Sequence, residues 1–415
     1  MTFFEIIAIL LTLSAVFSYI NHRYIGLPVT IGVMIIALAM SVVLNLLGYV
    51  GIELEGQAKT ILEDVHFDRT LLQGMLSFLL FAGALHVNIN DLAERKWAIG
   101  SLATAGTLIS TFLVGFLTWG VSEAIGLGLP FIYSLLFGAL ISPTDPIAVL
   151  GILKTAGAPK SLETKITGES LFNDGVGIVV FTVILEIATG GHAVSASHVG
   201  MLFLEEAVGG TIFGLVTGYM AYLMLRSIDN YQVEILITLA LVTGGYALAT
   251  ALHLSGPIAV VIAGLLIGNH GRSLGMSEET RHHLDIFWEL VDEVMNAVLF
   301  VLIGLEVLIL TFTGKFLLAG IIIIPLLLFS RFTAIWIPVY ILSFFRTFTP
   351  GAVRIMTWGG LRGGISVALA LSIPQSPERD VILAVTYMVV IFSIVVQGLT
   401  IEKLIQRTMG AHKRV

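Results

Sequence analysis

Four polar side chains that could bind a cation lie together in an apolar part of the chain. Ser170 and Asp174 are four residues apart, so they would share one face of a helix. Glu169 and Asn173 would share the neighbouring face, and all four directly precede the charge-free run Val176–Leu185. Ionisable groups at membrane depth are costly unless they are paired, hydrated or neutralised. A carboxylate in this stretch is therefore a candidate for function.

One carboxylate here could exchange a proton for a cation. Low dielectric favours the neutral form of a carboxylic acid, whereas carboxylate, hydroxyl and carbonyl oxygens suit a hard cation such as sodium. Asp174, Ser170 and Thr144 are the predicted sodium ligands, and Asn173 would hold the helix crossing beside them. A proton and a cation exclude each other at one carboxylate. A protein that moves only when this site is occupied would therefore exchange the two.

Composition indicates an all-α polytopic membrane protein. Of 415 residues, 57% are hydrophobic and 12% are charged, whereas soluble domains have about 25% charged residues. The chain has no cysteine, which excludes disulfides and thiolate sites. Apolar windows of membrane-spanning length predict about 13 helices. They run over 2–20, 28–48, 70–89, 97–121, 130–153, 166–190, 199–226, 231–253, 256–270, 285–311, 315–344, 351–374 and 380–402.

Lysine and arginine alternate between the predicted loops. The odd-numbered loops and the C-terminal tail carry most of these residues, as Arg23, Arg95, Lys165 and Arg346 illustrate. The positive-inside rule makes that side cytoplasmic. The N-terminus would then lie outside and the C-terminus in the cytoplasm, which requires an odd number of spans.

Two predicted spans are interrupted in their middle. Pro143 and Pro146 interrupt the fifth span, and four glycines within 359–364 interrupt the twelfth. Each interruption contains an ionisable residue, Asp145 in the fifth span and Arg362 in the twelfth. The two spans run in opposite directions, a pattern typical of inverted repeats whose broken helices cross at a central site. Two ordinary kinked helices are the alternative.

The charged residues of the interruptions are predicted to be structural. Arg362 is the predicted ion-pair partner of Glu169, because a buried carboxylate needs a fixed cation. Asp174 would then remain free to titrate. Asp145 would offset the positive ends of the half-helices, and a role as a direct ion ligand is the alternative.

Further titratable residues surround the tenth span. Glu289, Asp292 and Glu293 could line a cytoplasmic funnel that attracts cations, although a solvated helix end would look the same. His282 and His283 in the preceding loop could sense pH. Exposed loop histidines usually have no such role.

These motifs resemble the monovalent cation/proton antiporter family, in its NhaP and sodium/hydrogen exchanger branch. The resemblance rests on Ser142–Pro146, Gly168–Gly175 and Gly360–Ser366 and extends over nearly the whole chain. It implies a fold of 13 helices and electroneutral exchange, in which Asn173 and Asp174 form the family's Asn-Asp pair and Asp174 carries the ion. The family's serine, threonine and Glu-Arg structural pair correspond to Ser170, Thr144, Glu169 and Arg362.

The resemblance also implies how the membrane domain is divided. Residues 97–190 and 315–405 would form the ion-transport bundle, and 1–90 and 199–311 would form the dimerisation scaffold of a homodimer. One departure concerns the third span. Some relatives hold the ion with an acidic residue there, whereas Phe78–His86 contains none.

The sequence therefore predicts a secondary-active sodium/proton antiporter of the cell (inner) membrane. One proton would exchange for one monovalent cation, Na⁺ or Li⁺, by elevator-like alternating access, with potassium or calcium as alternative cargo. No cofactor, enzymatic activity or nucleic-acid partner is expected. A channel would conduct ions without proton coupling, and paired interrupted helices favour a transporter instead. An intramembrane hydrolase would use Asp145 and Asp174 as an acid/base dyad, but a helix break fits ion coordination better.

Overall fold

The described part of the chain is helical. The computed structural model describes residues 2–49, 70–145, 158–190, 196–310, 313–346 and 348–412, and the single positions 56, 59, 62, 67, 149 and 153. The helices are α1 (Phe3–Ile20), α2 (Val29–Tyr49), α5 (Leu76–Leu85), α6 (Ile89–Glu94), α7 (Lys96–Ser101), α8 (Thr107–Ile125), α9 (Phe131–Ile141), α11 (Lys160–Gly190), α12 (Ala196–Arg226), α13 (Tyr231–Ala251), α14 (Gly256–Leu266), α15 (Arg272–Gly275), α16 (Glu278–Glu306), α17 (Gly314–Ser343), α18 (Ala352–Trp358), α19 (Gly364–Ser372), α20 (Pro377–Phe392) and α21 (Gly398–His412). Several are continuous with π-helical turns, namely η1 (Asn21–Ile25), η2 (Thr70–Met75), η3 (Leu102–Gly106), η4 (Ile267–Gly271) and η5 (Ser393–Gln397).

The predicted all-α membrane fold is confirmed. Within the described ranges, eight helical segments are long and apolar enough to cross a membrane, and three shorter apolar helices accompany them. Each predicted span coincides with one helix or with consecutive helices, except that the fifth is described mainly up to Asp145. The residues directly after Asp145 lie outside the described part of the chain. Two spans, the fifth and the twelfth, are interrupted as predicted.

Two helix starts differ from prediction because polar turns precede an apolar segment. The sixth span, predicted over 166–190, begins at Lys160, and the tenth, predicted over 285–311, begins at Glu278. Ser277 is the N-cap of α16, and its side chain accepts a hydrogen bond from the main-chain N–H of Thr280 in the first turn. Hydropathy finds only the apolar part of such a helix, so it misses the polar first turns.

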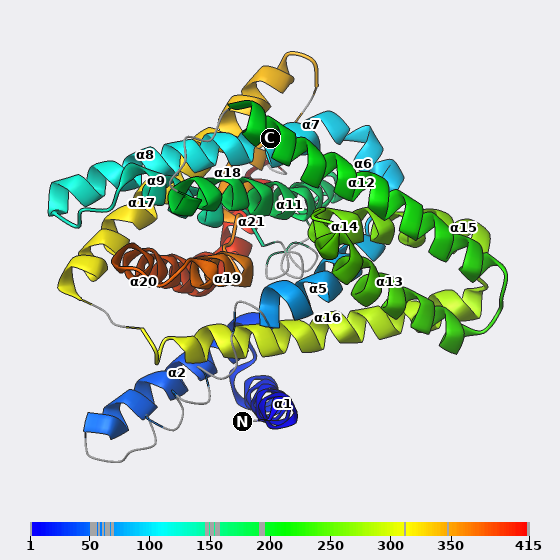
Figure 1. Ribbon diagram of the computed structural model, residues 1–415, viewed down its shortest axis with the longest axis horizontal. Helices are drawn as coiled ribbons and strands as arrows, with labels where there is room; N and C mark the ends of the chain where they lie inside the picture. The colour runs from blue at the N-terminus through cyan, green and yellow to red at the C-terminus, as the bar shows by residue number, and fades with distance from the viewer. Residues whose placement is uncertain are drawn as a thin grey trace.

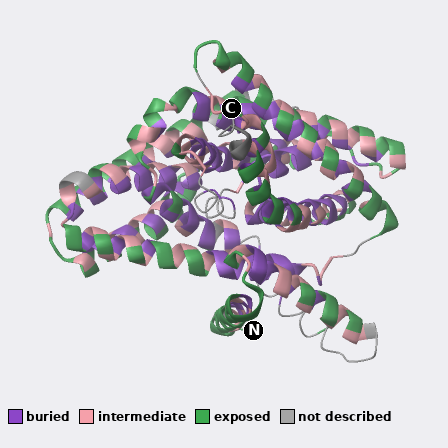
Figure 2. Cartoon of the chain, turned by 180° about the vertical axis from the view of Figure 1, so that it is seen from behind, coloured by how far each residue is buried: buried purple, intermediate pink, exposed green. Residues whose placement is uncertain are grey.

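Many exposed side chains on the outer helices are apolar. Figure 2 shows exposed residues on the outward faces of these helices. On α12 these include Leu204, Val208, Ile212, Leu215 and Tyr219. An apolar surface of this extent would be unusual for a soluble monomer. It matches a helix bundle that faces lipid hydrocarbon.

The helices pack into two neighbouring sets, and α11 belongs to the first through its contact with α9. Figure 1 shows α8, α17 and α20 toward the left and α13, α14 and α15 toward the right. In the first set α8 packs on α9 and α17, and α20 packs on α17 and α19. In the second set α14 packs on α5, α12 and α13, and α16 packs on α1, α2, α5 and α13. Contacts between the sets come from α11 against α5, α12 and α14, and from α19 against α16. The stretch with the candidate ion ligands lies in α11, at this boundary.

Glycine permits the closest of these helix contacts. A Cβ at Gly138 of α9 would overlap the carbonyl oxygen of Thr111 in α8. The α8–α9 contact therefore brings main chain against main chain. It fixes the position of α9, whose last residue, Ile141, directly precedes the first interruption.

Candidate ion-binding site

The two interruptions meet and pair through their main chains. The first follows α9, and the second separates α18 from α19. The N–H of Asp145 donates a hydrogen bond of 2.8 Å to the carbonyl oxygen of Leu361, which forms an antiparallel bridge between them. The broken helices predicted from proline and glycine therefore do cross at one point. Their freed main-chain groups are the scaffold of the site.

Each interruption supplies a charge to a half-helix of the other. Nη1 of Arg362 donates to the carbonyl oxygens of Ser142 and Pro143, with a distance of 2.7 Å to the latter, at the C-terminal end of α9. Asp145 packs closely against Gly363, the N-cap residue of α19. A Cβ at Gly363 would overlap the Asp145 carboxylate. Helix C-termini carry partial negative charge and N-termini partial positive charge. Both ionic side chains therefore lie at helix ends of opposite sign.

The structure corrects one predicted ion pair. Glu169 is paired with Arg331 of α17, not with Arg362, and the distance from its Oε1 to Nη1 of Arg331 is 2.5 Å. Both side chains are buried, with exposed fractions of 1% for Glu169 and 7% for Arg331. The predicted partner was wrong because Arg362 is bound to main-chain carbonyls. One sequence signal could have found Arg331, since it is the only charged residue between Lys315 and Arg346.

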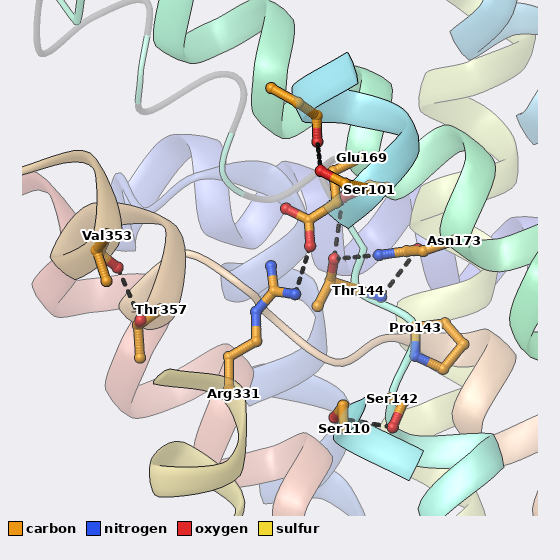
Figure 3. A network of polar contacts seen from close by, with 12 residues as sticks. Ser101, Ser110, Ser142, Pro143, Thr144, Glu169, Asn173, Arg331, Val353 and Thr357 are labelled. Atoms are coloured by element: carbon orange, nitrogen blue, oxygen red, sulfur yellow. Dashed lines mark hydrogen bonds and ion pairs between the residues drawn. The ribbon is translucent and has the colours of Figure 1, made fainter. Parts of the chain in front are cut away.

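Asn173 ties α11 to the first interruption. Its Oδ1 accepts a hydrogen bond of 3.3 Å from the N–H of Thr144, and its Nδ2 donates one of 3.0 Å to the Thr144 hydroxyl. The Ser170 hydroxyl lies 3.1 Å from the same Thr144 oxygen. Figure 3 shows Thr144 between Asn173 on one side and the Glu169–Arg331 pair on the other. The predicted ligands Thr144 and Ser170 are thus brought together and fully buried.

Asp174 lies on the wall of a cavity of about 670 Å³. Its side chain is 5% exposed. With the residues that the structure describes, its carboxylate makes no hydrogen bond or ion pair. Asp145 also lines the cavity, whereas Thr144 and Ser170 are not among the described lining residues. The described wall thus carries two carboxylates, those of Asp174 and Asp145, whereas the two hydroxyl groups do not line it.

The cavity extends from Asp174 to a polar rim. The rim includes Asp91 of α6 and Lys160 of α11, whose side chains form an ion pair of 2.7 Å, and also Glu163. Another part of the wall is formed by leucines and Gly83 of α5 and by His86 directly after it, and none of these is a carboxylate. The third span therefore supplies no acidic ligand, as its sequence indicates.

Two of the three acidic residues of the tenth span reach the cavity. Glu289 and Asp292 line the cavity, whereas Glu293 is not among its described lining residues. The prediction that His282 and His283 lie in a loop is wrong, because both belong to the first turns of α16. His283 stacks on Tyr231 of α13, with ring centroids 4.2 Å apart. The described cavity wall thus contains two of the three predicted funnel residues.

Comparison with known proteins decides the family. The family described as "Sodium/hydrogen exchanger, transmembrane" matches residues 10–407. The chain belongs to the sodium/hydrogen exchanger family. It is 52% identical over 410 residues to the Na(+)/H(+) antiporter NhaP of Pseudomonas aeruginosa, which covers 97% of this chain and 96% of that protein. It is 36% identical over 361 residues to the Na(+)/H(+) antiporter NhaH of Halobacillus dabanensis, with coverages of 85% and 87%.

The fold of this exchanger-family protein also has a solved counterpart. The structure of the sodium proton antiporter MjNhaP1 from Methanocaldococcus jannaschii at pH 8 superposes with a TM-score of 0.77 at 19% identity, over 99% of this chain and 100% of that one. At this identity the likeness concerns the fold. The predicted membership in the NhaP branch and the predicted fold are both confirmed.

Proposed function

We propose that this protein is a secondary-active sodium/proton antiporter in which Asp174 binds a proton and a sodium ion in turn. One observation carries the proposal. Asp174 is a buried carboxylate on a cavity wall, without an ion-pair partner among the described residues. The buried charges nearby are engaged, since Glu169 is bound to Arg331 and Arg362 to main-chain carbonyls.

The local charge balance supports an exchange of one proton for one monovalent cation. The Glu169–Arg331 pair is neutral as a unit, so it adds no net charge to the site. Asp174 binds a single positive charge, which either a proton or a sodium ion supplies. The site then carries the same charge in both loaded states, so the exchange is electroneutral. The Thr144 and Ser170 hydroxyls and nearby main-chain carbonyls would complete the coordination of sodium.

The boundary between the two helix sets supports an elevator-like movement. Residues 97–190 and 315–405 would move as the transport bundle against a scaffold of 1–90 and 199–311, through which two copies would form a homodimer. The cavity beside Asp174 has walls from both sets, namely α11 and α19 on one side and α5 and α16 on the other. Displacement of one set against the other would therefore change which side of the membrane reaches Asp174.

The charged loops indicate how the protein is oriented in the membrane. The cavity rim includes Lys160, the first residue of α11, which follows a connection that the positive-inside rule assigns to the cytoplasm. The cavity would thus open to the cytoplasm, with the N-terminus outside, the C-terminus inside and the protein in the cell (inner) membrane. Rim carboxylates such as Glu163 would attract cations toward it.

The test is transport by the purified protein in liposomes that contain a pH-sensitive dye. An imposed sodium gradient should move protons in the opposite direction, and a panel of Na⁺, Li⁺, K⁺ and Ca²⁺ gradients would identify the cargo. The substitution Asp174→Asn should abolish exchange while preserving shape. Glu293→Gln, which removes a carboxylate away from the described cavity wall, is the matched control and should remain active. Continued sodium/proton exchange by Asp174→Asn would refute the proposal.

A further inference from the structure

A second hollow, separate from the cavity at Asp174, is lined by cationic and aromatic side chains. It has a volume of about 460 Å³ and lies between α7, the first turns of α11 and the connection from α17 to α18. Its cations are Arg95, Lys165 and Arg346, and its aromatic residues are Trp97 and Phe348. The two hollows share no described lining residue. Three segments that are distant in sequence thus bring positive charge to one place.

Lys165 is the most unusual member of this cluster. Its side chain is 6% exposed, and its Nζ lies over the ring of Phe348, 4.4 Å from the ring centroid. With the residues that the structure describes, it makes no hydrogen bond or ion pair. The Lys165 side chain is largely buried without a counter-charge among the described residues, and one cation–π contact offsets only part of the cost of this burial. The arrangement therefore favours an anion as occupant.

The remaining charges of the hollow leave a positive excess. Arg95 has one carboxylate partner, Glu94, at 3.2 Å, and the Glu94 side chain is 71% exposed. Arg346 is exposed at the rim. Among the described lining residues, the three cations thus face a single carboxylate, which is already engaged.

Hydroxyl groups in the same wall suit the oxygens of a phosphate group. Ser161 and Thr349 both line the hollow, and their hydroxyls form a hydrogen bond of 3.2 Å with each other. Each can rotate its O–H to donate to an anion. Guanidinium, ammonium and hydroxyl donors together are the usual set around phosphate oxygens.

Aromatic residues beside the hollow indicate its depth in the membrane. Tyr340, Phe344 and Phe345 are exposed at the end of α17, directly before Arg346. Aromatic side chains gather where hydrocarbon meets the headgroup layer. Trp97, on the opposite wall, is also exposed. We therefore expect the hollow to lie at the level of phospholipid headgroups.

We propose that this hollow is a binding site for a phosphate group, held by Lys165 and Arg346 with help from Arg95 and the two hydroxyls. An anionic phospholipid and inorganic phosphate present the same oxygens, and the depth of the hollow favours the lipid. The bound group would join α7 and α11 to the connection before α18. It would thus link both sequence halves of the bundle around Asp174 without touching the cavity.

The test is a titration of the detergent-purified full chain, at constant ionic strength, followed by its thermal unfolding midpoint. Phosphatidylglycerol, phosphatidylcholine and inorganic phosphate are added in separate arms. Phosphatidylglycerol should raise the midpoint of the wild type, and phosphatidylcholine should not. Arg346→Gln and Lys165→Met should each weaken the apparent affinity for phosphatidylglycerol by about fivefold, the effect of one cation near an anionic surface.

Two variants separate this site from general charge effects. Lys96→Gln removes an exposed cation of α7 outside the hollow and should titrate like the wild type. Lys165→Arg keeps the charge and should retain the response. If inorganic phosphate stabilises the wild type and loses its effect in the same variants, the site holds a soluble phosphate. Equal stabilisation by both lipids, or an unchanged titration in Arg346→Gln and Lys165→Met, would overturn the proposal.

Discussion

Glu169 and Arg331 form a buried ion pair, 2.5 Å from oxygen to nitrogen, that joins α11 to α17 beside the crossing of the interrupted helices. The pair ties the helix that carries Asp174 to the next long helix of the same set. Because both charges are buried, each is satisfied mainly by the other. Removing one partner leaves an uncompensated charge in low dielectric, whereas removing both does not.

We expect Arg331→Met to destabilise the protein by about 3–5 kcal/mol, because Glu169 would remain buried without its cation. Glu169→Gln should have a comparable effect for the converse reason. The double substitution Arg331→Met/Glu169→Met should recover most of the loss. Thermal unfolding of the detergent-purified variants checks this. Additive losses in the double variant would show that the two side chains do not act as a pair.

The Asn173 contacts give a graded prediction. Asn173→Ala removes both hydrogen bonds to Thr144 and should cost about 1–3 kcal/mol, because a main-chain N–H is left without its acceptor. Ser170→Ala removes one hydroxyl contact with Thr144 and should cost less. Urea titration of purified variants would order them. A larger loss for Ser170→Ala than for Asn173→Ala would contradict the assignment.

The close contact at Gly363 predicts a severe effect from one methyl group. Gly363→Ala would place a Cβ against the Asp145 carboxylate and push the interruptions apart, so both the unfolding midpoint and exchange should fall sharply. Gly100→Ala is the matched control, since a Cβ at Gly100 meets no atom within 4 Å. That exposed helical position should tolerate alanine or gain slightly, by up to about 1 kcal/mol. Equal behaviour of the two variants would contradict the tight crossing.

Two acidic residues of α16 should act on cations before they reach Asp174. Glu289→Gln and Asp292→Asn each remove a charge from the cavity wall and should raise the apparent KM for sodium, by roughly threefold at low ionic strength. High salt should screen most of this difference. Glu293→Gln should leave the KM unchanged. Sodium-dependent exchange rates at two ionic strengths provide the measurement.

Competition at Asp174 predicts how transport depends on pH. A protonated carboxylic acid does not bind sodium, so the apparent KM for sodium should rise as the pH falls. At acidic pH the rise should approach tenfold per pH unit, because one proton competes with one cation. At alkaline pH the KM should reach a plateau. A KM that does not change between these limits would mean that protons bind elsewhere.

Much of the architecture could be predicted because its signals are local. The prolines and glycines that break two helices, and the ionisable residues Asp145 and Arg362 within the breaks, are visible in the sequence. The confirmed crossing follows from them. What Arg362 binds could not be predicted, because its acceptors are main-chain carbonyls, and these have no side-chain signature.

The pairing of Glu169 could not be predicted for a different reason. Arg331 is 162 positions away in the chain, and its partner depends on how α17 packs against α11. Whether Asp292 or Glu293 faces the cavity likewise depends on the rotation of α16 about its axis. A run of acidic residues leaves that rotation undefined. The hollow at Lys165 depends on three distant segments that meet only in the folded protein.

The bridge between Asp145 and Leu361 uses only main-chain atoms, so its chemistry is indifferent to side-chain identity. Exchanging the carboxylate at position 145 would alter the electrostatics of the crossing but leave this connection in place. Proline at the same position would remove the N–H and sever it. The ionic side chains at the crossing can therefore change in evolution while the main-chain bridge between positions 145 and 361 is kept.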